Sequence, residues 1–263
     1  MHSSTALPDQ RQQLIVARLA RDGRVLAVAL AREFATSEDT IRRDLRDLAA
    51  AGQCRRVYGG ALPVSPASGS LANRTAESPA RKAALGQAAA RLVQPGQIAF
   101  IDAGSTNLAI ARALPEGLGA TIVTNAPGIA AALTGRIGIE LVMIGGRIDP
   151  RSGAALGGRA IQELREIRLD AVFLGTCSVD AGAGLGAFDY EEAVFKRALA
   201  HMAQTVITAS LNEKLGTFAP YAVLPVCGLT HLVVEADAPP ASLADFAGHN
   251  IQIHVARAAE HTP

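Results

Sequence analysis

Residues 37–48 read SEDTIRRDLRDL, a run that combines the start of a helix with an amphipathic helical pattern. Ser37 precedes two carboxylates, and a hydroxyl followed by acidic residues is typical of a helix start, where free N–H groups need acceptors. Ile41, Leu45 and Leu48 recur at helical spacing, so one face of this helix is expected to pack against a core. The remaining face carries arginines, which bind phosphate oxygens or guanine edges in a DNA major groove.

Two more helices and a hairpin are predicted around this run. Apolar spacing predicts helices over Gln12–Ala20 and Val25–Phe34. Gly52 ends the third helix, and residues 53–60, which read QCRRVYGG, are predicted to form a short hairpin. This order of elements predicts a winged helix-turn-helix domain over residues 9–62, mostly α-helical with a small β wing.

The charge distribution agrees with a nucleic-acid-binding head. Residues 11–62 hold ten arginines and six acidic residues, whereas the whole chain has a net charge of only +1. A basic head on a slightly acidic body favours DNA binding by the head alone. The alternative for the arginines is the solvated face of an ordinary three-helix bundle.

Composition limits the class of protein. The chain has 263 residues, of which 49% are hydrophobic and 19% charged, enough for a small domain and a larger packed core. Neither a signal peptide nor an apolar run long enough to span a membrane is found, so a cytoplasmic protein without membrane contact is expected. Cys54, Cys177 and Cys227 lack CxxC spacing, so neither a disulfide framework nor a metal site is expected, and no cofactor is implied.

A change of pattern follows the head. Residues 63–79 are rich in Pro, Ser, Ala and Gly and are predicted to be a linker. From residue 80 to 257, helical and apolar extended segments alternate. Helices are predicted over Lys82–Leu92 and Asn107–Leu114, and strands over Ile98–Asp102, Thr121–Thr124, Glu140–Ile144, Ala171–Leu174, Thr205–Ala209, His231–Val234 and Ile251–Val255. Continuous apolar strands are typical of a parallel sheet buried on both faces, so a doubly wound α/β domain is predicted.

The residues that follow these strands favour an anion. Asp102 ends one predicted strand, and Gly104, Ser105 and Thr106 then begin a helix whose N–H groups and hydroxyls suit a phosphate. An ordinary capped turn is the alternative. The other strand ends contribute further candidate ligand-binding residues: Thr124, Asn125, Gly145, Gly146, Gly175 and Lys214. Because ligands of such sheets bind beyond the carboxyl ends of the strands, a small phosphorylated ligand is predicted there.

The head resembles the DNA-binding domain of the DeoR (deoxyribose operon repressor) family. The resemblance covers Val25–Leu62 and is carried by the run TIRRDL at residues 40–45 and the ending YGGA at residues 58–61. It implies a double-stranded DNA operator as partner. The residues implied to face DNA are Ser37, Thr40, Arg42, Arg43 and Arg46, with Arg55 and Arg56 on the wing. Asp44 is expected to pair locally instead of contacting bases.

The body is similar to the sensor domain of the same family, in the stretch DAGST at residues 102–106 and in the pairs 124–125 and 145–146. The resemblance implies a fold similar to ribose-5-phosphate isomerase and a phosphorylated sugar or related metabolite as effector. It implies that Asp102 binds ligand hydroxyls and that residues 104–106 bind the phosphate. It also implies that Asn125 hydrogen-bonds the ligand and that Lys214 binds negative charge of the ligand.

Three features of the body leave details of that resemblance open. Arg81-Lys82 stands where relatives carry a Glu-Lys pair, and Leu211 stands where many carry an aspartate. Glu192 and Lys196, four residues apart, are expected either to face the ligand or to form a surface ion pair.

The predicted function is a DNA-binding transcriptional regulator, a repressor of a carbohydrate-metabolism operon that acts as a homo-oligomer, dimer or tetramer, and whose DNA affinity a phosphorylated sugar tunes. The alternative is a sugar-phosphate isomerase-like enzyme. Those isomerases carry an Asp-Gly-x-x-Glu type motif after a central strand, whereas residues 174–180 read LGTCSVD, so an enzyme is not expected. Cys177 is interpreted as a small buried residue. An RNA-binding regulator is disfavoured because the chain is only 4% aromatic.

Overall fold

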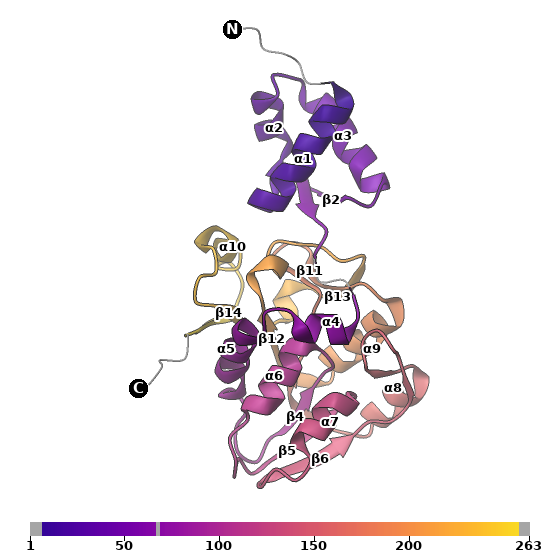
Figure 1. The fold of residues 1–263 in the computed structure, drawn as a ribbon, viewed down its shortest axis with the longest axis vertical. Helices are drawn as coiled ribbons and strands as arrows, with labels where there is room; N and C mark the ends of the chain where they lie inside the picture. Colours follow the sequence, from indigo (N-terminus) through magenta and orange to yellow (C-terminus); the bar gives the residue numbers. More distant parts are fainter. Residues whose placement is uncertain (1–6, 67–68, 258–263) are drawn as a thin grey trace.

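The computed structural model describes residues 7–66 and 69–257 and shows a small N-terminal head at one end of a larger α/β body (Figure 1). The elements of the head, in chain order, are α1 (Pro8–Asp22), β1 (Val25–Leu26), α2 (Ala27–Glu33), α3 (Glu38–Ala50), β2 (Cys54–Val57) and β3 (Gly60–Pro63). Within the described residues β1, β3 and β2 form an antiparallel sheet in that order. The predicted winged helix-turn-helix is confirmed.

The second helix of the head begins later than predicted. Val25 and Leu26 form a strand, because their backbone pairs with Ala61 and Gly60 of the wing before α2 starts at Ala27. This close pairing requires glycine at position 60, since a Cβ there would lie 1.8 Å from the carbonyl oxygen of Val25. The helix predicted over Val25–Phe34 was therefore wrong at its first two residues.

The body contains, within the described residues, a seven-stranded parallel sheet that confirms the predicted α/β class. Its strands in spatial order are β15 (Gln252–Ala256), β14 (His231–Glu235), β12 (Ala203–Ser210), β9 (Leu169–Phe173), β4 (Ile98–Ile101), β5 (Ala120–Thr124) and β6 (Ile139–Met143). Each corresponds to a predicted strand, with ends shifted by one or two residues.

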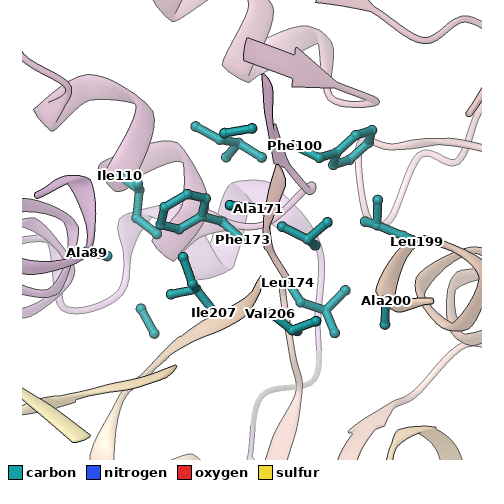
Figure 2. Close-up of a cluster of buried hydrophobic side chains, with 14 of the residues drawn as sticks. Ala89, Phe100, Ile110, Ala171, Phe173, Leu174, Leu199, Ala200, Val206 and Ile207 are labelled. Carbon is teal, nitrogen blue, oxygen red and sulfur yellow. The ribbon is translucent and has the colours of Figure 1, made fainter. Parts of the chain in front are cut away.

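Helices cover both faces of this sheet, as a doubly wound fold requires. The helices of the body from residue 79 onwards are α5 (Pro79–Ala90), α6 (Ser105–Ala113), α7 (Pro127–Leu133), α8 (Gly158–Leu164), α9 (Tyr190–Ala200) and α10 (Pro240–Ala244), and there are 3-10 turns at η1 (Asn212–Lys214) and η2 (Val226–Gly228). Figure 2 shows Phe173 beside Ile110 of α6 on one side of the sheet and Phe100 towards Leu199 of α9 on the other. All four side chains are at most 1% exposed, so the sheet is buried on both faces.

Smaller strands of the body were not predicted. Within the part of the chain that the structure describes, β10 (Ser178–Asp180), β11 (Gly184–Ala187) and β13 (Tyr221–Leu224) form an antiparallel sheet, and β7 (Arg147–Ile148) pairs with β8 (Ala155–Leu156). The first sheet lies on the side of the body next to the head (Figure 1).

The segment 63–79, predicted as a linker, has structure of its own. It contains α4 (Leu71–Ala76), whose first turn is capped by the Ser70 hydroxyl accepting from Asn73 N at 3.3 Å. Ser65 is 3% exposed and donates its hydroxyl to the Cys177 carbonyl at 2.5 Å. The described part of this segment therefore packs on the body.

No helix in residues 7–66 or 69–257 combines the length and apolar character needed to cross a membrane.

Candidate nucleic-acid interface and ligand pocket

Helix α3 starts where the sequence predicts and presents the predicted arginines. Ser37 Oγ accepts from Thr40 N at 3.1 Å, which satisfies a free donor of the first turn. On the buried face, Ile41, Leu45 and Leu48 are 0 to 3% exposed. The side chains of Arg42, Arg43 and Arg46 are exposed.

The three arginines of α3 differ in their partners. Arg42 is held by Glu38 at 2.9 Å and Asp39 at 3.4 Å. Arg43 and Arg46 make no ion pair or side-chain hydrogen bond with any described residue. Their guanidinium groups are free to bind phosphate or base edges, whereas Arg42 must first leave its carboxylates.

A buried ion pair braces α3 against α1. Arg11 Nε lies 2.5 Å from Asp44 Oδ2 and Arg11 Nη2 lies 3.1 Å from Asp44 Oδ1, with both side chains at most 7% exposed. The hydrogen bond to Asp44 raises the pKa of Arg11. The expectation that Asp44 pairs within the head is confirmed, and the pair links α1 to the arginine-bearing helix.

The two wing arginines differ in their surroundings. The Arg55 guanidinium carbon lies 4.5 Å from the ring centroid of Phe218 in the body, a cation–π contact. Arg56, on the same strand β2, is exposed and has no described side-chain partner. Arg56 is thus available to DNA, whereas the structure places Arg55, predicted as a DNA contact, between head and body.

In the body, the ends of β4, β9 and β12 meet at a pocket. Its lining residues are Arg74, Ala103, Gly104, Ser105, Thr106, Asn107, Gly175, Thr176, Cys177, Glu192, Lys196, Ala209 and Lys214. Five of the ten predicted effector residues are in this set: Gly104, Ser105, Thr106, Gly175 and Lys214.

The remaining predicted residues lie behind or away from the pocket. Thr124 and Asn125 are fully buried, and Asn125 Oδ1 accepts from Ala103 N at 3.2 Å, so both support the strand ends. Gly145 N donates to Glu163 at 2.8 Å beyond β6, and neither Gly145 nor Gly146 lines the pocket. The reason is topological, because β6 is the edge strand and β5 separates it from β4.

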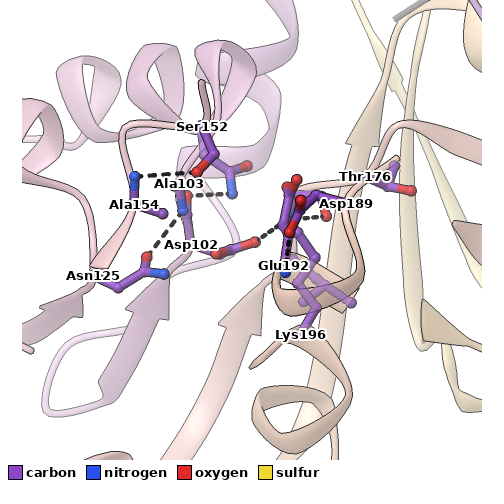
Figure 3. Close-up of polar contacts among 12 residues, drawn as sticks. Asp102, Ala103, Asn125, Ser152, Ala154, Thr176, Asp189, Glu192 and Lys196 are labelled. Atoms are coloured by element: carbon purple, nitrogen blue, oxygen red, sulfur yellow. Dashed lines mark hydrogen bonds and ion pairs between the residues drawn. The ribbon is translucent and has the colours of Figure 1, made fainter. Parts of the chain in front are cut away.

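Asp102 lies beneath the pocket in a buried ion pair. Its Oδ2 is 2.5 Å from Lys196 Nζ and accepts from Gly175 N at 3.0 Å (Figure 3). Lys196 also lies 3.2 Å from Glu192, and it is 1% exposed. Of the two alternatives for Glu192 and Lys196, the structure excludes a surface ion pair, because Lys196 is buried. Burial disfavours the charged ammonium, but the carboxylates of Asp102 and Glu192 outweigh it and raise the pKa of Lys196.

The N-terminus of α6 supplies the anion-binding geometry. Gly104 caps the helix with φ +153°, and the first-turn N–H groups that follow have no acceptor inside the helix. The Thr106 hydroxyl is buried and has no hydrogen-bond partner among the described residues. A buried hydroxyl of this kind is costly, so it indicates a place for a ligand oxygen.

Cations surround this helix end. Lys214 Nζ donates to the Thr176 carbonyl at 2.9 Å, and burial lowers the pKa of Lys214 to about 8, helped by the nearby charges of Arg74, Lys82 and Lys196. Crowded positive charge is relieved by an anion. In the lining of this pocket, the positive side chains of Arg74, Lys196 and Lys214 outnumber the single carboxylate, Glu192.

Arg74 is a charged pocket residue that the sequence did not indicate. It comes from α4, inside the predicted linker, and its Nε is buried without a partner among the described residues. A lone arginine in a stretch of low complexity carried no signal, and only the packing of α4 on the body brings it to the pocket. Cys177 is 4% exposed, which confirms its interpretation as buried, and burial raises the pKa of its thiol.

The two departures from the family pattern have local explanations. Arg81 pairs with Glu235 at 2.5 Å and with Glu213 at 2.8 Å, so its charge is balanced outside the pocket. Leu211 is 3% exposed and belongs to the core cluster of the body.

Family models match both parts of the chain. The DeoR-like helix-turn-helix domain matches residues 11–67, and the DeoR C terminal sensor domain matches residues 77–236. This chain belongs to the DeoR family. It is a DNA-binding transcriptional regulator, and the alternative of an isomerase-like enzyme is wrong.

Curated relatives that are named as transcriptional regulators align over almost the whole chain. The putative aga operon transcriptional repressor of Escherichia coli O157:H7 is 28% identical, covering 93% of this chain and 92% of the relative. The glycerol-3-phosphate regulon repressor of Escherichia coli K12 is 29% identical, covering 94% and 98%. The transcriptional regulator GlpR of Haloferax volcanii is 30% identical, covering 95% and 100%.

Two solved structures are also similar to this DeoR-family chain. Ribose 5-phosphate isomerase A from Methanocaldococcus jannaschii has a TM-score of 0.37 at 17% identity, covering 51% of this chain and 52% of that one. The sorbitol operon regulator SorC from Klebsiella pneumoniae has a TM-score of 0.37 at 15% identity, covering 78% and 90%.

Proposed function

We propose that this regulator represses a carbohydrate-metabolism operon and that a small phosphorylated sugar or polyol weakens its hold on DNA. The observation that carries the proposal is the presence, in one chain, of unpaired arginines on a capped, braced helix and of a separate cationic pocket at a helix N-terminus. Relatives named as repressors of the glycerol-3-phosphate regulon and the aga operon support the same class of effector.

The DNA contacts in this proposal come from α3 and the wing. Arg43 and Arg46 bind phosphate or guanine in the major groove, with Ser37 and Thr40 at the N-terminus of α3 near the backbone. Arg42 joins them when DNA draws it from its carboxylates. Arg56 contributes from the wing.

The effector contacts come from the end of β4 and its neighbours. The phosphate lies against the N–H groups and hydroxyls of Ser105 and Thr106, with Lys214 and Arg74 balancing its charge. Lys196 is already neutralised by Asp102 and Glu192, so it positions Asp102 and Gly175 and leaves the phosphate to the other cations.

A homo-oligomer completes the proposal. A symmetric dimer or tetramer carries paired heads, and paired heads bind repeated half-sites with the affinity that a repressor needs. This part is supported by the small size of a single head and its one recognition helix.

A gel-shift titration tests the proposal. The protein is titrated against the DNA upstream of its own gene at two salt concentrations, with and without a panel of sugar phosphates and polyol phosphates. Salt-sensitive, sequence-selective binding that one compound weakens is the expected result. Turnover of a panel sugar without selective DNA binding would contradict it.

A further inference from the structure

The segment that leaves the pocket at Lys214 runs directly to the junction between body and head. Lys214 lines the pocket, and the chain continues through Leu215 and Gly216 to Phe218, four residues later. Gly216 N donates to the Val179 carbonyl at 2.8 Å, and the Thr217 hydroxyl donates to the Lys214 carbonyl at 2.8 Å. These bonds make residues 214–218 a short segment that is tied to itself and to Val179.

Phe218 is where this segment meets the head. Its N–H donates to the Pro63 carbonyl at 3.0 Å, and its carbonyl accepts from Ser65 N at 2.8 Å, so it pairs with the chain that leaves the wing strand β3. Its ring also carries the Arg55 guanidinium of the wing at 4.5 Å. The wing is thus held by the backbone and the ring of a single residue.

A second contact between head and body lies near the same segment. Arg24, in the turn after α1, lies 3.2 Å from Asp245 and 3.8 Å from Asp180. Asp180 follows Val179, which forms a β-bridge with Leu215. A cavity of about 230 Å³ lies between these contacts, lined by Arg24, Asp180, Leu215 and Asp245 among others. The head therefore meets this side of the body with open space beside it.

We propose that residues 214–218 couple effector binding in the pocket to the position of the wing. The contact between the Arg55 guanidinium and the Phe218 ring is where this segment acts on the head. The proposal rests on the proposed function. An anion at the start of α6 competes with the Thr176 carbonyl for the Lys214 ammonium, and the tied segment moves with the lysine. Coupling arises because the effector binds the two positions of this segment unequally.

The test compares the effect of a probe on DNA affinity in variants of the full chain. Fluorescence anisotropy measures the Kd for the upstream DNA with and without glycerol 3-phosphate, and calorimetry measures the Kd for glycerol 3-phosphate itself. In the wild type the probe is expected to raise the DNA Kd at least about tenfold, a coupling in the range typical of allosteric proteins. The ratio of the DNA Kd with the probe to the DNA Kd without it measures the coupling. In Phe218→Leu this ratio is expected to be less than about two, while the Kd for the probe itself stays within about twofold of the wild-type value.

A matched control tests whether the effect is specific to the contact between Arg55 and Phe218 or follows from the loss of any cation–π contact. Tyr190 and Arg197 make a cation–π contact at 6.0 Å within α9, and neither residue belongs to the head or to residues 214–218. Tyr190→Leu is expected to keep the wild-type ratio. Should Phe218→Leu fail to fold, Arg55→Lys decides instead, because it keeps the charge on an exposed strand and removes the planar group that stacks.

The possible results separate the two proposals. If Phe218→Leu keeps the wild-type ratio of DNA Kd values with and without the probe, the proposed role of residues 214–218 is overturned. The same holds for Arg55→Lys where Phe218→Leu does not fold. Binding of glycerol 3-phosphate without any change in the wild-type DNA Kd overturns the coupling alone. Failure of both glycerol 3-phosphate and inorganic phosphate to bind the wild type overturns the proposed effector site, and the coupling with it.

Discussion

Two threonines near the pocket differ in what their hydroxyls do. Thr124 Oγ1 donates to the Ile101 carbonyl at 2.7 Å and accepts from Ala126 N at 3.1 Å, so it holds two strand ends together. Thr106 Oγ1 is buried without a partner among the described residues. A group that contributes nothing to the fold at such a position is best explained by a ligand.

Thr106→Val therefore tests the site at the scale of one atom. Losing a hydrogen bond to a charged ligand oxygen costs roughly 1.5 to 3 kcal/mol, so effector affinity is expected to fall at least about tenfold without loss of stability. Thr124→Val is the control, expected to lower the free energy of unfolding by about 1 to 3 kcal/mol and to leave effector affinity unchanged. Calorimetry measures the effector affinity of each variant, and urea unfolding measures its free energy of unfolding. Unchanged affinity in Thr106→Val would remove its hydroxyl from the site.

The pKa of Lys214 makes effector binding depend on pH. Burial lowers this pKa to about 8, and a bound phosphate favours the protonated lysine. Affinity is expected to fall as pH rises above about 8, because the ammonium is lost, and to fall below about 6, because the phosphate gains a proton. Calorimetry between pH 5 and 10 checks this on the wild type, with Lys214→Met as control. A Kd that stays constant from pH 7 to 10 would contradict a phosphate beside Lys214.

At the scale of elements, α3 depends on its brace as well as on its cap. The Arg11–Asp44 pair is buried between α1 and α3, so removing one partner leaves a buried charge alone. Asp44→Asn is expected to lower the free energy of unfolding of the head by roughly 3 kcal/mol and to weaken DNA binding. Asp47→Asn, an exposed change on the same helix, is expected to change it by less than about 0.5 kcal/mol. Equal stability of the two variants in urea unfolding would show that the brace does not hold α3.

Much of the fold follows from patterns that each element carries alone. The strands of the parallel sheet are predictable because burial on both faces makes them continuous apolar runs. The strands of the smaller sheet are not, since β11 reads GLGA and has neither alternation nor β-branched residues. Val25 and Leu26 continue a helical pattern, but pairing with the wing overrides it.

At the scale of the whole molecule, strand order decides which predicted site residues meet. The residues after β4 and β9 converge because these strands are neighbours, whereas Gly145 follows the edge strand β6 and lies elsewhere. The pocket position of Arg74 and the contact of Arg55 with Phe218 were not predicted, for a related reason. Each owes its place to a contact between segments far apart in the chain, which no local pattern records.

The central claim is that α3 reads DNA through its unpaired arginines. Anisotropy of the upstream DNA at a series of salt concentrations tests it most directly, with Arg43→Ala compared to Arg21→Ala, whose arginine pairs with Asp22 on α1. Arg43→Ala is expected to bind at least about tenfold more weakly, with a salt slope smaller by about one, while Arg21→Ala and the affinity for glycerol 3-phosphate stay at wild-type values. Wild-type DNA affinity and salt slope in Arg43→Ala would contradict the claim.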